Sequence, residues 1–333
     1  MGTHGARWEV AAARFLYSRD EQTAEAETFP EQADYVWADL RPAEHTELAA
    51  VVNRLYPAHP AAISRVLRAD EVKRPSLLVE DDALVFVVAL HATLGAPQHV
   101  ADLGVFLGRA FLVTVHLSAH DQTVRDAWEF IKRNELLDQG TDFALYQLLS
   151  RHLEDFRTLL RQVDGEFENV HRMMLQHPYR NLAPDILHLR KWTLRLQDVV
   201  QPEMEIFELL KSTGFLYVQK TNRPYFEDLA GQMRDLVGRV GSTREALSGT
   251  VEAYTSIQSN EINKVVKLLT FLSVLALPAT TIASIYGMNF LIPELHWRYG
   301  YWYSLVLMGL VTTAILLYMR NRGWFRDKSG NSG

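Results

Sequence analysis

The sequence predicts an α/β domain, in which helices flank a mixed sheet, followed by a very long stalk helix and two C-terminal transmembrane helices. Three observations lead to this fold class. Residues 34–118 contain short runs rich in valine, leucine and phenylalanine, separated by turn residues. From about residue 121, apolar residues recur three and four positions apart with charges between them, which is the helical period. Residues 268–293 and 299–319 contain no Asp, Glu, Lys or Arg.

The composition narrows the classes of function. A chain of 333 residues can hold more than one domain. The formal net charge is −6, the opposite of the basic excess typical of nucleic-acid-binding proteins, so no nucleic-acid partner is expected. The absence of cysteine excludes disulfide frameworks and cysteine-based zinc sites.

Residues 1–120 are expected to form the α/β part of the chain. The segment DYVWADL (34–40) is a strand candidate, and HTELAAVVNRLY (45–56) has helical spacing. Segments 76–92 and 99–118 each carry a turn candidate in the middle of an apolar run, and together they predict a meander of about four strands. The turn candidates are Glu80-Asp81-Asp82 and Gly108-Arg109.

Residues 121–223 are expected to be helical and, like residues 1–120, to lie in the cytoplasm. Three segments, 121–134, 142–177 and 185–212, show the helical spacing of apolar residues. Long amphipathic helices of this kind bury their apolar stripe against a neighbour, so we expect them to pack together.

Residues 224–288 are expected to form a stalk helix that runs into the first membrane span. No proline interrupts the sequence from Tyr225 until Pro278. A helix of about 60 residues would be roughly 90 Å long. Such a helix needs partners, and copies of the same chain are the expected ones.

The two uncharged segments are long enough to cross a bilayer, since a crossing takes about 20 residues. Basic residues flank the pair of segments on its outer sides: Lys264, Lys267, Arg320, Arg322, Arg326 and Lys328. Because basic residues favour the cytoplasmic side, both termini are expected there, with loop 289–300 outside. The expected spans are 267–288 and 301–320, followed by a basic tail at 321–333. The alternative, two buried helices of a soluble protein, does not account for the basic flanks.

The first span carries a regular line of positions with a 3.5-residue period. The line is Asn263, Val266, Thr270, Ser273, Leu277, Thr280 and Ser284. This is the period of a supercoiled contact line, and five of the seven side chains can form hydrogen bonds. Polar groups are unfavourable in lipid, so the line should face protein or water. Ordinary helix packing and a pore lined by several copies both fit this spacing.

The tripeptide Gly287-Met288-Asn289 follows the first span. Gly287 can adopt backbone angles that end a helix. Asn289 offers an uncharged oxygen, and several copies would form a ring that can hold a hydrated cation through its water shell. Mg²⁺ suits such a ring because it gives up its water reluctantly. The simpler interpretation is that Gly287 and Asn289 only terminate the helix.

The surrounding motifs resemble those of the CorA family of magnesium and cobalt transporters. The segments YGMNF (286–290) and IPELHW (292–297) lie between the last two spans, as do the family's GMN tripeptide and MPEL-type loop. Ile292 stands where methionine is usual. The segments YVWADL, RPSLLVEDDALVFVV, PYFEDL, SNEINKVVKLLT and RNRGWF are similar to other parts of the family, so the resemblance covers nearly the whole chain.

This resemblance implies a funnel-shaped homopentamer in the cell membrane, and not an enzyme. Five first spans would line the pore and five second spans would surround them, with Mg²⁺ and also Co²⁺ entering the cell. The resemblance assigns Gly287, Met288 and Asn289 to the selectivity filter, Glu294 to the external loop, and Asn263, Val266, Leu269, Thr270, Ser273, Leu277, Thr280 and Ser284 to the pore lining and gate. Val266 and Leu269 match the hydrophobic gate, although Leu269 lies one residue off the line through Thr270.

The family resemblance also implies that intracellular Mg²⁺ closes the channel by binding acidic sites between neighbouring cytoplasmic domains. Asp228, in PYFEDL, matches one of those acids. Gly95 stands where the family has its partner aspartate. Candidates to replace that partner are Asp81, Asp82 and Asp102. Glu252 matches an acid that faces the pore axis, and a solvated stalk charge is the equally weighted alternative.

Two other functions are compatible with parts of the sequence. The ZntB-type branch of the family, which carries Zn²⁺ with protons, shares the architecture, and His116 with His120 is the one tight histidine pair outside helical segments. A membrane-anchored sensor or enzyme is the second alternative. The sequence contains no Walker A, GxGxxG, HExxH or GxSxG motif, so no small-molecule substrate beyond cations is expected.

Overall fold

The structure is a computed structural model in which two compact units are distinguished, Met1–Val251 and Glu252–Gly333. The residues it describes are 13–41, 45–55, 60–67, 75–79, 83–90, 101–116, 122–177, 180–212, 216–288, 293 and 297–322.

The first unit contains a seven-stranded mixed sheet with strand order β2-β1-β3-β7-β6-β5-β4. The strands are β1 (Arg14–Arg19), β2 (Gln22–Ala26), β3 (Tyr35–Leu40), β4 (Ser76–Val79), β5 (Leu84–Leu90), β6 (Ala101–Leu107) and β7 (Phe111–His116). Among the strand pairs of the described residues, β3–β7 is parallel, with Trp37 opposite Leu112, and the others are antiparallel. The predicted strand at 34–40 and the predicted four-stranded meander are confirmed as β3 and β4 to β7.

The hairpin of β1 and β2 was missed by the sequence prediction. Its turn residues, Asp20 and Glu21, have φ angles of 49° and 65°. Two such residues make the type of turn that matches the twist of a hairpin, but asparagine or glycine usually marks it. Strand β2 (QTAEA) lies at the edge of the sheet and contains no large apolar residue, so its sequence carries little strand signal.

The first unit contains helices in the predicted segments and also a helix at 60–67 and a 3₁₀ helix at 136–139, which the sequence did not predict. They are α1 (His45–Leu55), α2 (Pro60–Leu67), α4 (Gln122–Arg133), the short 3₁₀ helix η1 (Leu136–Gln139), α5 (Thr141–Gln176) and α6 (Ala183–Leu210). Helix α7 (Arg223–Tyr286) begins in this unit and continues into the second. The three helical segments predicted between 121 and 212 correspond to α4, α5 and α6.

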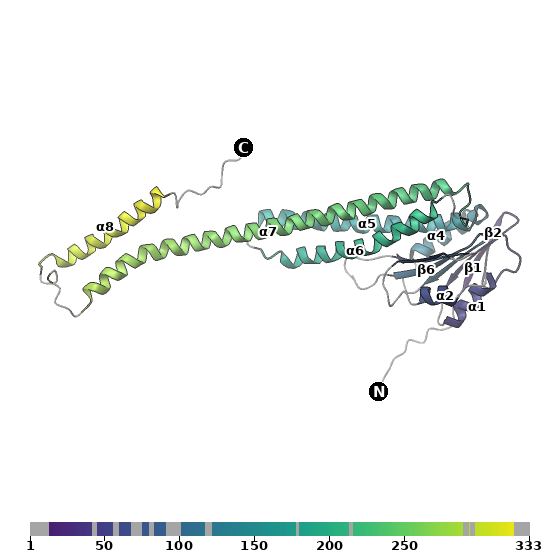
Figure 1. The fold of residues 1–333 in the computed structure, drawn as a ribbon, viewed down its shortest axis with the longest axis horizontal. Coiled ribbons are helices and arrows are strands. Elements are labelled where there is room, and N and C mark those ends of the chain that lie inside the picture. The colour runs from purple at the N-terminus through teal and green to yellow at the C-terminus, as the bar shows by residue number, and fades with distance from the viewer. Residues whose placement is uncertain are drawn as a thin grey trace, which may run out of the picture. The chain divides into compact units, whose positions relative to one another are not determined.

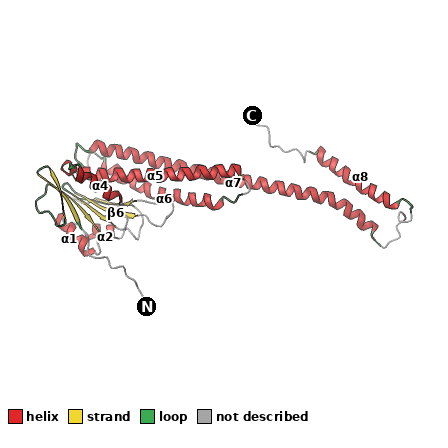
Figure 2. Cartoon of the chain, turned by 180° about the vertical axis from the view of Figure 1, so that it is seen from behind, coloured by secondary structure: helices red, strands yellow, loops and turns green. Residues whose placement is uncertain are grey.

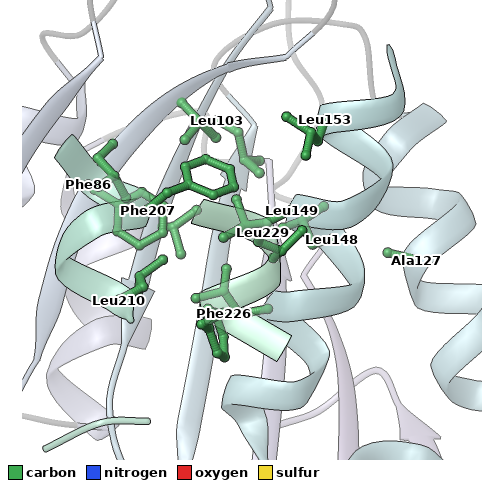
Figure 3. Packing of buried hydrophobic residues seen from close by; sticks show 14 of the residues in the cluster. Phe86, Leu103, Ala127, Leu148, Leu149, Leu153, Phe207, Leu210, Phe226 and Leu229 are labelled. Carbon is green, nitrogen blue, oxygen red and sulfur yellow. The ribbon is translucent and has the colours of Figure 1, made fainter. Parts of the chain in front are cut away.

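Two hydrophobic cores lie on opposite faces of the sheet, because successive strand residues point to opposite sides. On β5, Leu84 and Phe86 enter one core, while Val85 and Val87 enter the other. Helices α1 and α2 cover the face with Val85 and Val87, and α4 to α7 cover the opposite face (Figures 1 and 2). In that larger core, Phe207 and Leu210 of α6 meet Phe86, Leu149, Phe226 and Leu229 (Figure 3).

A buried acidic side chain connects the helices to the end of β5. The side chain of Glu203 on α6 is fully buried, and its Oε1 accepts a hydrogen bond from the Ala89 backbone N–H at 2.8 Å. Its Oε2 lies 2.7 Å from Nε2 of the buried His152 on α5. Strand β4 pairs with β5 only as far as Val87, so Glu203 takes a backbone donor beyond the end of that pairing.

The second unit contains the C-terminal half of α7 and helix α8 (Gly300–Asn321). Both helices are long and apolar enough to cross a membrane, and their apolar stretches are almost entirely exposed in the single chain. Helix α7 continues through Pro278 to Tyr286. The two predicted spans are therefore helical, as expected from their lack of charge.

Candidate functional site

The eight positions assigned to the pore lining all lie on α7, and most of their side chains are exposed. Thr270 is half-buried, and the other seven are exposed in the single chain: Asn263, Val266, Leu269, Ser273, Leu277, Thr280 and Ser284. Val266, Leu269 and Leu277 expose 52%, 64% and 62% of their surface. Leucine side chains exposed in this way are unfavourable in water, and the hydroxyl groups between them are unfavourable in lipid. This face of α7 therefore requires lipid, further copies of the chain or both as neighbours.

Hydroxyl groups along this face donate to the backbone of their own helix. The bonds are Thr270 Oγ1 to the Val266 carbonyl at 2.8 Å, Ser273 Oγ to the Leu269 carbonyl at 2.9 Å, and Thr280 Oγ1 to the Ala276 carbonyl at 2.9 Å. Each hydroxyl has one hydrogen, and it is used in this bond. The oxygen lone pairs remain, so the face offers acceptors.

Pro278 adds a further acceptor to the middle of the same helix. Proline has no N–H, so it cannot donate to the carbonyl four residues earlier, at Val274. Within a membrane span such a carbonyl must be satisfied by another group or by water.

The helix ends just before the predicted tripeptide, but Gly287 does not adopt the left-handed backbone angles that often end a helix. Gly287 does not have a positive φ, and its N–H donates to the Ala283 carbonyl at 2.9 Å. A Cβ at this position would lie 3.2 Å from that carbonyl oxygen, which is tight. A side chain here would need the Ala283 carbonyl to shift by a few tenths of an ångström. Met288 is half exposed, and Asn289 and Glu294 lie outside the described residues.

Asp228 is exposed on the second turn of α7. Gln232 Nε2 donates to its Oδ2 at 2.5 Å, and no basic side chain among the described residues forms an ion pair with it. Glu252 is also exposed, and it lies 14 residues, or two heptads, before Val266. With 3.5 residues per turn, Glu252 therefore lies on the same face of α7 as Val266.

The candidate partners of Asp228 are only partly described. Asp102 lies on β6 opposite Ala89 of β5, so it is near the end of the hairpin. Asp81, Asp82 and Gly95 lie outside the described residues.

An aromatic cluster that the sequence did not reveal lies beside Asp228. The rings of Tyr146 on α5 and Tyr225 on α7 have centroids 4.9 Å apart at an angle of 34°. Phe143 contacts both rings at 5.7 Å, and Phe226 lies 6.3 Å from Tyr146. The tyrosines are 79 residues apart in the chain, so no local spacing signals their contact.

His116 is part of a buried network in the sheet. Its Nε2 lies 2.7 Å from Asp39 Oδ1, and Asp39 also accepts from Thr114 at 2.6 Å and from Arg14 at 2.8 Å. Burial acts to raise the pKa of Asp39, but the hydrogen bond and charge of His116, with Arg14 and Thr114, hold it below its usual value. His120 lies outside the described residues. Within the described part of the chain, no three His, Asp or Glu side chains are grouped to hold a metal.

A family model described as "CorA-like Mg2+ transporter protein" matches residues 32–321. Among curated proteins, the chain is similar to the "Cobalt/magnesium transport protein CorA" of Thermotoga maritima. The two are 24% identical over 315 residues, which is 92% of this chain and 89% of that protein.

Two solved structures share the fold. "The complete structure of CorA magnesium transporter from Methanocaldococcus jannaschii" matches with a TM-score of 0.78 and 20% identity, over 94% of this chain and 98% of that chain. The "ZntB cytoplasmic domain from Vibrio parahaemolyticus" matches with a TM-score of 0.60 and 10% identity, over 74% of this chain and 98% of that chain.

Proposed function

The chain belongs to the CorA-like Mg²⁺ transporter family, and from this premise we propose that it forms a homopentameric channel that carries Mg²⁺ into the cell. Its class, a divalent metal transporter of the membrane and not an enzyme, follows from the family. The proposal adds the ion, the assembly, Co²⁺ as a second substrate, and cytoplasmic N- and C-termini.

The observation that carries this proposal is the exposed polar line on α7. It runs from Asn263 to Ser284, just before the Gly287-Met288-Asn289 tripeptide. Five copies around an axis would turn each hydroxyl position into a ring of oxygen acceptors. Water bound to a cation points its hydrogens outward, so such rings suit a hydrated cation.

Selection and gating follow from different kinds of side chain. At the outer end, rings of Asn289 oxygens and backbone carbonyls would bind the hydrated ion without a formal charge. At the inner end, rings of Val266 and Leu269 offer nothing to replace lost water, so a narrow arrangement of them blocks conduction by dewetting. An inside-negative potential contributes about 4.6 kcal/mol per 100 mV to the entry of a divalent ion, twice the single-charge value.

Regulation by intracellular Mg²⁺ belongs to the same proposal. Asp228 and Glu252 are exposed carboxylates, and neither forms an ion pair among the described residues. Both are thus free to take a hard cation through oxygen, and Mg²⁺ typically binds one or two carboxylates while keeping several waters. Ion binding that favours the closed arrangement would shut the channel as the cell fills.

The test is ion flux into proteoliposomes, with Mg²⁺, Co²⁺ and Zn²⁺ compared under a membrane potential, a pH gradient, both or neither. The proposal expects Mg²⁺ entry driven by potential alone. Zn²⁺ entry that requires a proton gradient would instead place the chain in the zinc-carrying branch. The cytoplasmic part of the chain also shares its fold with a ZntB cytoplasmic domain. Absence of flux for all three ions under every one of these conditions contradicts the transport function.

A further inference from the structure

Helix α8 has a covered side and an exposed side within the second unit. Gly300, Ser304 and Met319 are buried, and half-buried residues between them recur three and four positions apart. The half-buried residues are Leu307, Met308, Val311, Thr312, Ile315 and Leu316. A helix presents residues with this spacing on one side, so the opposite side is exposed. We call the exposed side the outward side; it consists of Trp302, Val306, Leu310, Thr313, Leu317 and Arg320.

Trp302 and Arg320 lie at the two ends of the outward side. They are 18 residues apart, which is five turns of 3.6 residues, so both point in the same direction from the helix. At 1.5 Å per residue they are about 27 Å apart along the axis, close to the thickness of a hydrocarbon core, ~30 Å. Tryptophan favours the membrane interface, and the long stem of arginine lets its charge reach the headgroups. The pair therefore fits the two surfaces of one bilayer.

The outward side is apolar between these ends. Val306, Leu310 and Leu317 expose 59%, 64% and 50% of their surface. No Asp, Glu, Lys or Arg occurs between Trp302 and Arg320. Contacts between helices in membranes favour small residues, whereas this side presents large aliphatic ones. Lipid chains are therefore the occupant that the outward side fits.

The two ends of α8 differ in the kind of side chain they present. Exposed aromatic rings gather at one end, where Arg298 is also exposed. The rings are Trp297, Tyr299, Tyr301 and Trp302. At the other end, Arg320 and Arg322 are exposed, and residues 297–322 include no acidic residue to neutralise them. An aromatic end and a basic end indicate different partners in the two leaflets.

The two arginines at the basic end have different surroundings. Arg322 follows the buried Ser304 by 18 residues, so it points toward the covered side. Its guanidinium carbon lies 5.6 Å from the centroid of the Tyr318 ring. Arg320 points outward, and no described residue forms an ion pair or a ring contact with it. Its five N–H donors and permanent charge are available to a group outside the chain.

We propose that the outward side of α8 is a lipid-contact surface on which Arg320 binds the headgroup phosphate of an anionic phospholipid. The fork of the guanidinium matches two phosphate oxygens. The acyl chains of this lipid lie along Leu317 and Leu310, toward the middle of the span. A lipid with a net negative charge is favoured over a zwitterionic one, because the ammonium group of the zwitterionic lipid repels arginine.

The lipid site rests on the proposed function for the leaflet that it names. With a cytoplasmic C-terminus, Arg320 meets the cytoplasmic leaflet, where anionic lipids give the surface its negative potential. Trp302 at the opposite interface and Arg320 at this one hold α8 at two points of the same side. Together they limit both the vertical shift of the helix and its rotation about its own axis.

The experiment counts the lipids that the full-length protein retains in detergent micelles, by native mass spectrometry, as lipid is added. The probes are dioleoylphosphatidylglycerol, which is anionic, and dioleoylphosphatidylcholine, which is zwitterionic. The wild type should retain the anionic lipid more tightly. Arg320→Gln should bind it about 5-fold more weakly, the value of one basic side chain near an anionic surface. Arg320→Lys keeps the charge but loses the fork, so its affinity should lie between the two.

Arg322→Gln is the matched control, because it removes the same charge two residues away on the covered side. Its affinity for the anionic lipid should change by less than about 2-fold. Equal losses in Arg320→Gln and Arg322→Gln would overturn the site, since the attraction would then be a general effect of charge. Equal retention of the two lipids by the wild type would also overturn it.

A second readout follows Trp302 in proteoliposomes that contain brominated phosphatidylcholine, which quenches nearby tryptophan fluorescence. The contribution of Trp302 is the difference between the wild type and Trp302→Phe. Bromine near the headgroup should quench it more than bromine near the chain end, and the reverse order would contradict the interfacial position. Trp192→Phe is the control, because Trp192 is buried in the first unit and its removal should leave the quenching unchanged.

Flux of Mg²⁺ measured on the same variants separates the two proposals. Wild-type flux together with an unchanged lipid preference in Arg320→Gln refutes only the lipid site. Retention of the anionic lipid through Arg320 without flux of any divalent ion refutes only the transport function.

Discussion

Replacing Glu203 by alanine should strongly destabilise the first unit. The side chain is fully buried and makes two bonds, to the Ala89 backbone N–H at 2.8 Å and to His152 Nε2 at 2.7 Å. Removal leaves the Ala89 N–H and His152 Nε2 buried without this partner. Leaving a buried polar group without a hydrogen-bond partner typically lowers the free energy of unfolding by about 1–3 kcal/mol, so a loss of about 2–6 kcal/mol is expected for the two groups.

For a unit of this size, each kcal/mol lowers the melting temperature by about 2–4 °C, so a decrease of roughly 4–24 °C is expected. The measurement is thermal unfolding of the full-length protein in detergent, followed by circular dichroism. Glu205→Ala is the matched control, because Glu205 lies on the same helix and is exposed. A change of at most about 0.5 kcal/mol is expected there.

The melting temperature of Glu203→Gln should lie between those of Glu203→Ala and Glu205→Ala. The glutamine keeps an oxygen for the Ala89 N–H but loses the charge toward His152. Equal melting temperatures for Glu203→Ala and Glu205→Ala would refute the reasoning, because the buried bonds would then contribute nothing to the stability of the fold.

Three further outcomes are expected. Asn289→Ala should abolish Mg²⁺ flux into proteoliposomes while the oligomer elutes unchanged in size-exclusion chromatography; wild-type flux would remove Asn289 from the filter. Asp228→Asn should weaken any Mg²⁺-dependent protection from proteolysis, because a carboxylate suits this cation better than an amide, and full protection would place the sensing elsewhere. Asp39 has a pKa lowered from 3.8, so the stability it contributes is present above that value and is lost as the pH falls through the lower folded pKa. Asp39→Asn should make the free energy of unfolding less dependent on pH in this acid range, as measured by denaturant unfolding at several pH values. An unchanged pH dependence would argue against a lowered pKa of Asp39.

The membrane part of the fold was the most predictable from sequence. Absence of charge, helical length and basic flanks are properties of single segments, so the two spans could be recognised without tertiary information. The line from Asn263 to Ser284 was also readable, because a 3.5-residue period is local to one helix. Whether that line faces a pore or a packed helix depends on the number of copies, which spacing along one chain does not encode.

The parts that were missed depend on contacts between distant segments. Glu203, next to Pro202 inside α6, has the sequence pattern of an ordinary helical charge, and its burial follows from the packing of α6 against β4 and β5. Tyr146 and Asp228 are 82 residues apart, and only the packing of α5 on α7 brings them into electrostatic contact. Strand β2 was missed for a different reason, since an edge strand exposed to solvent needs no apolar alternation.

The hydroxyl hydrogens on α7 point to backbone carbonyls of the same helix, and this orientation also affects the binding of anions. Chloride or phosphate would need donors to replace its water, and Thr270, Ser273 and Thr280 have already committed theirs to backbone carbonyls. In the proposed channel, the sign of the permeant ion would therefore be decided by the polarity of uncharged groups. Serine and threonine do not titrate in the physiological range, so this discrimination against anions would persist across pH values at which carboxylate rings lose their charge.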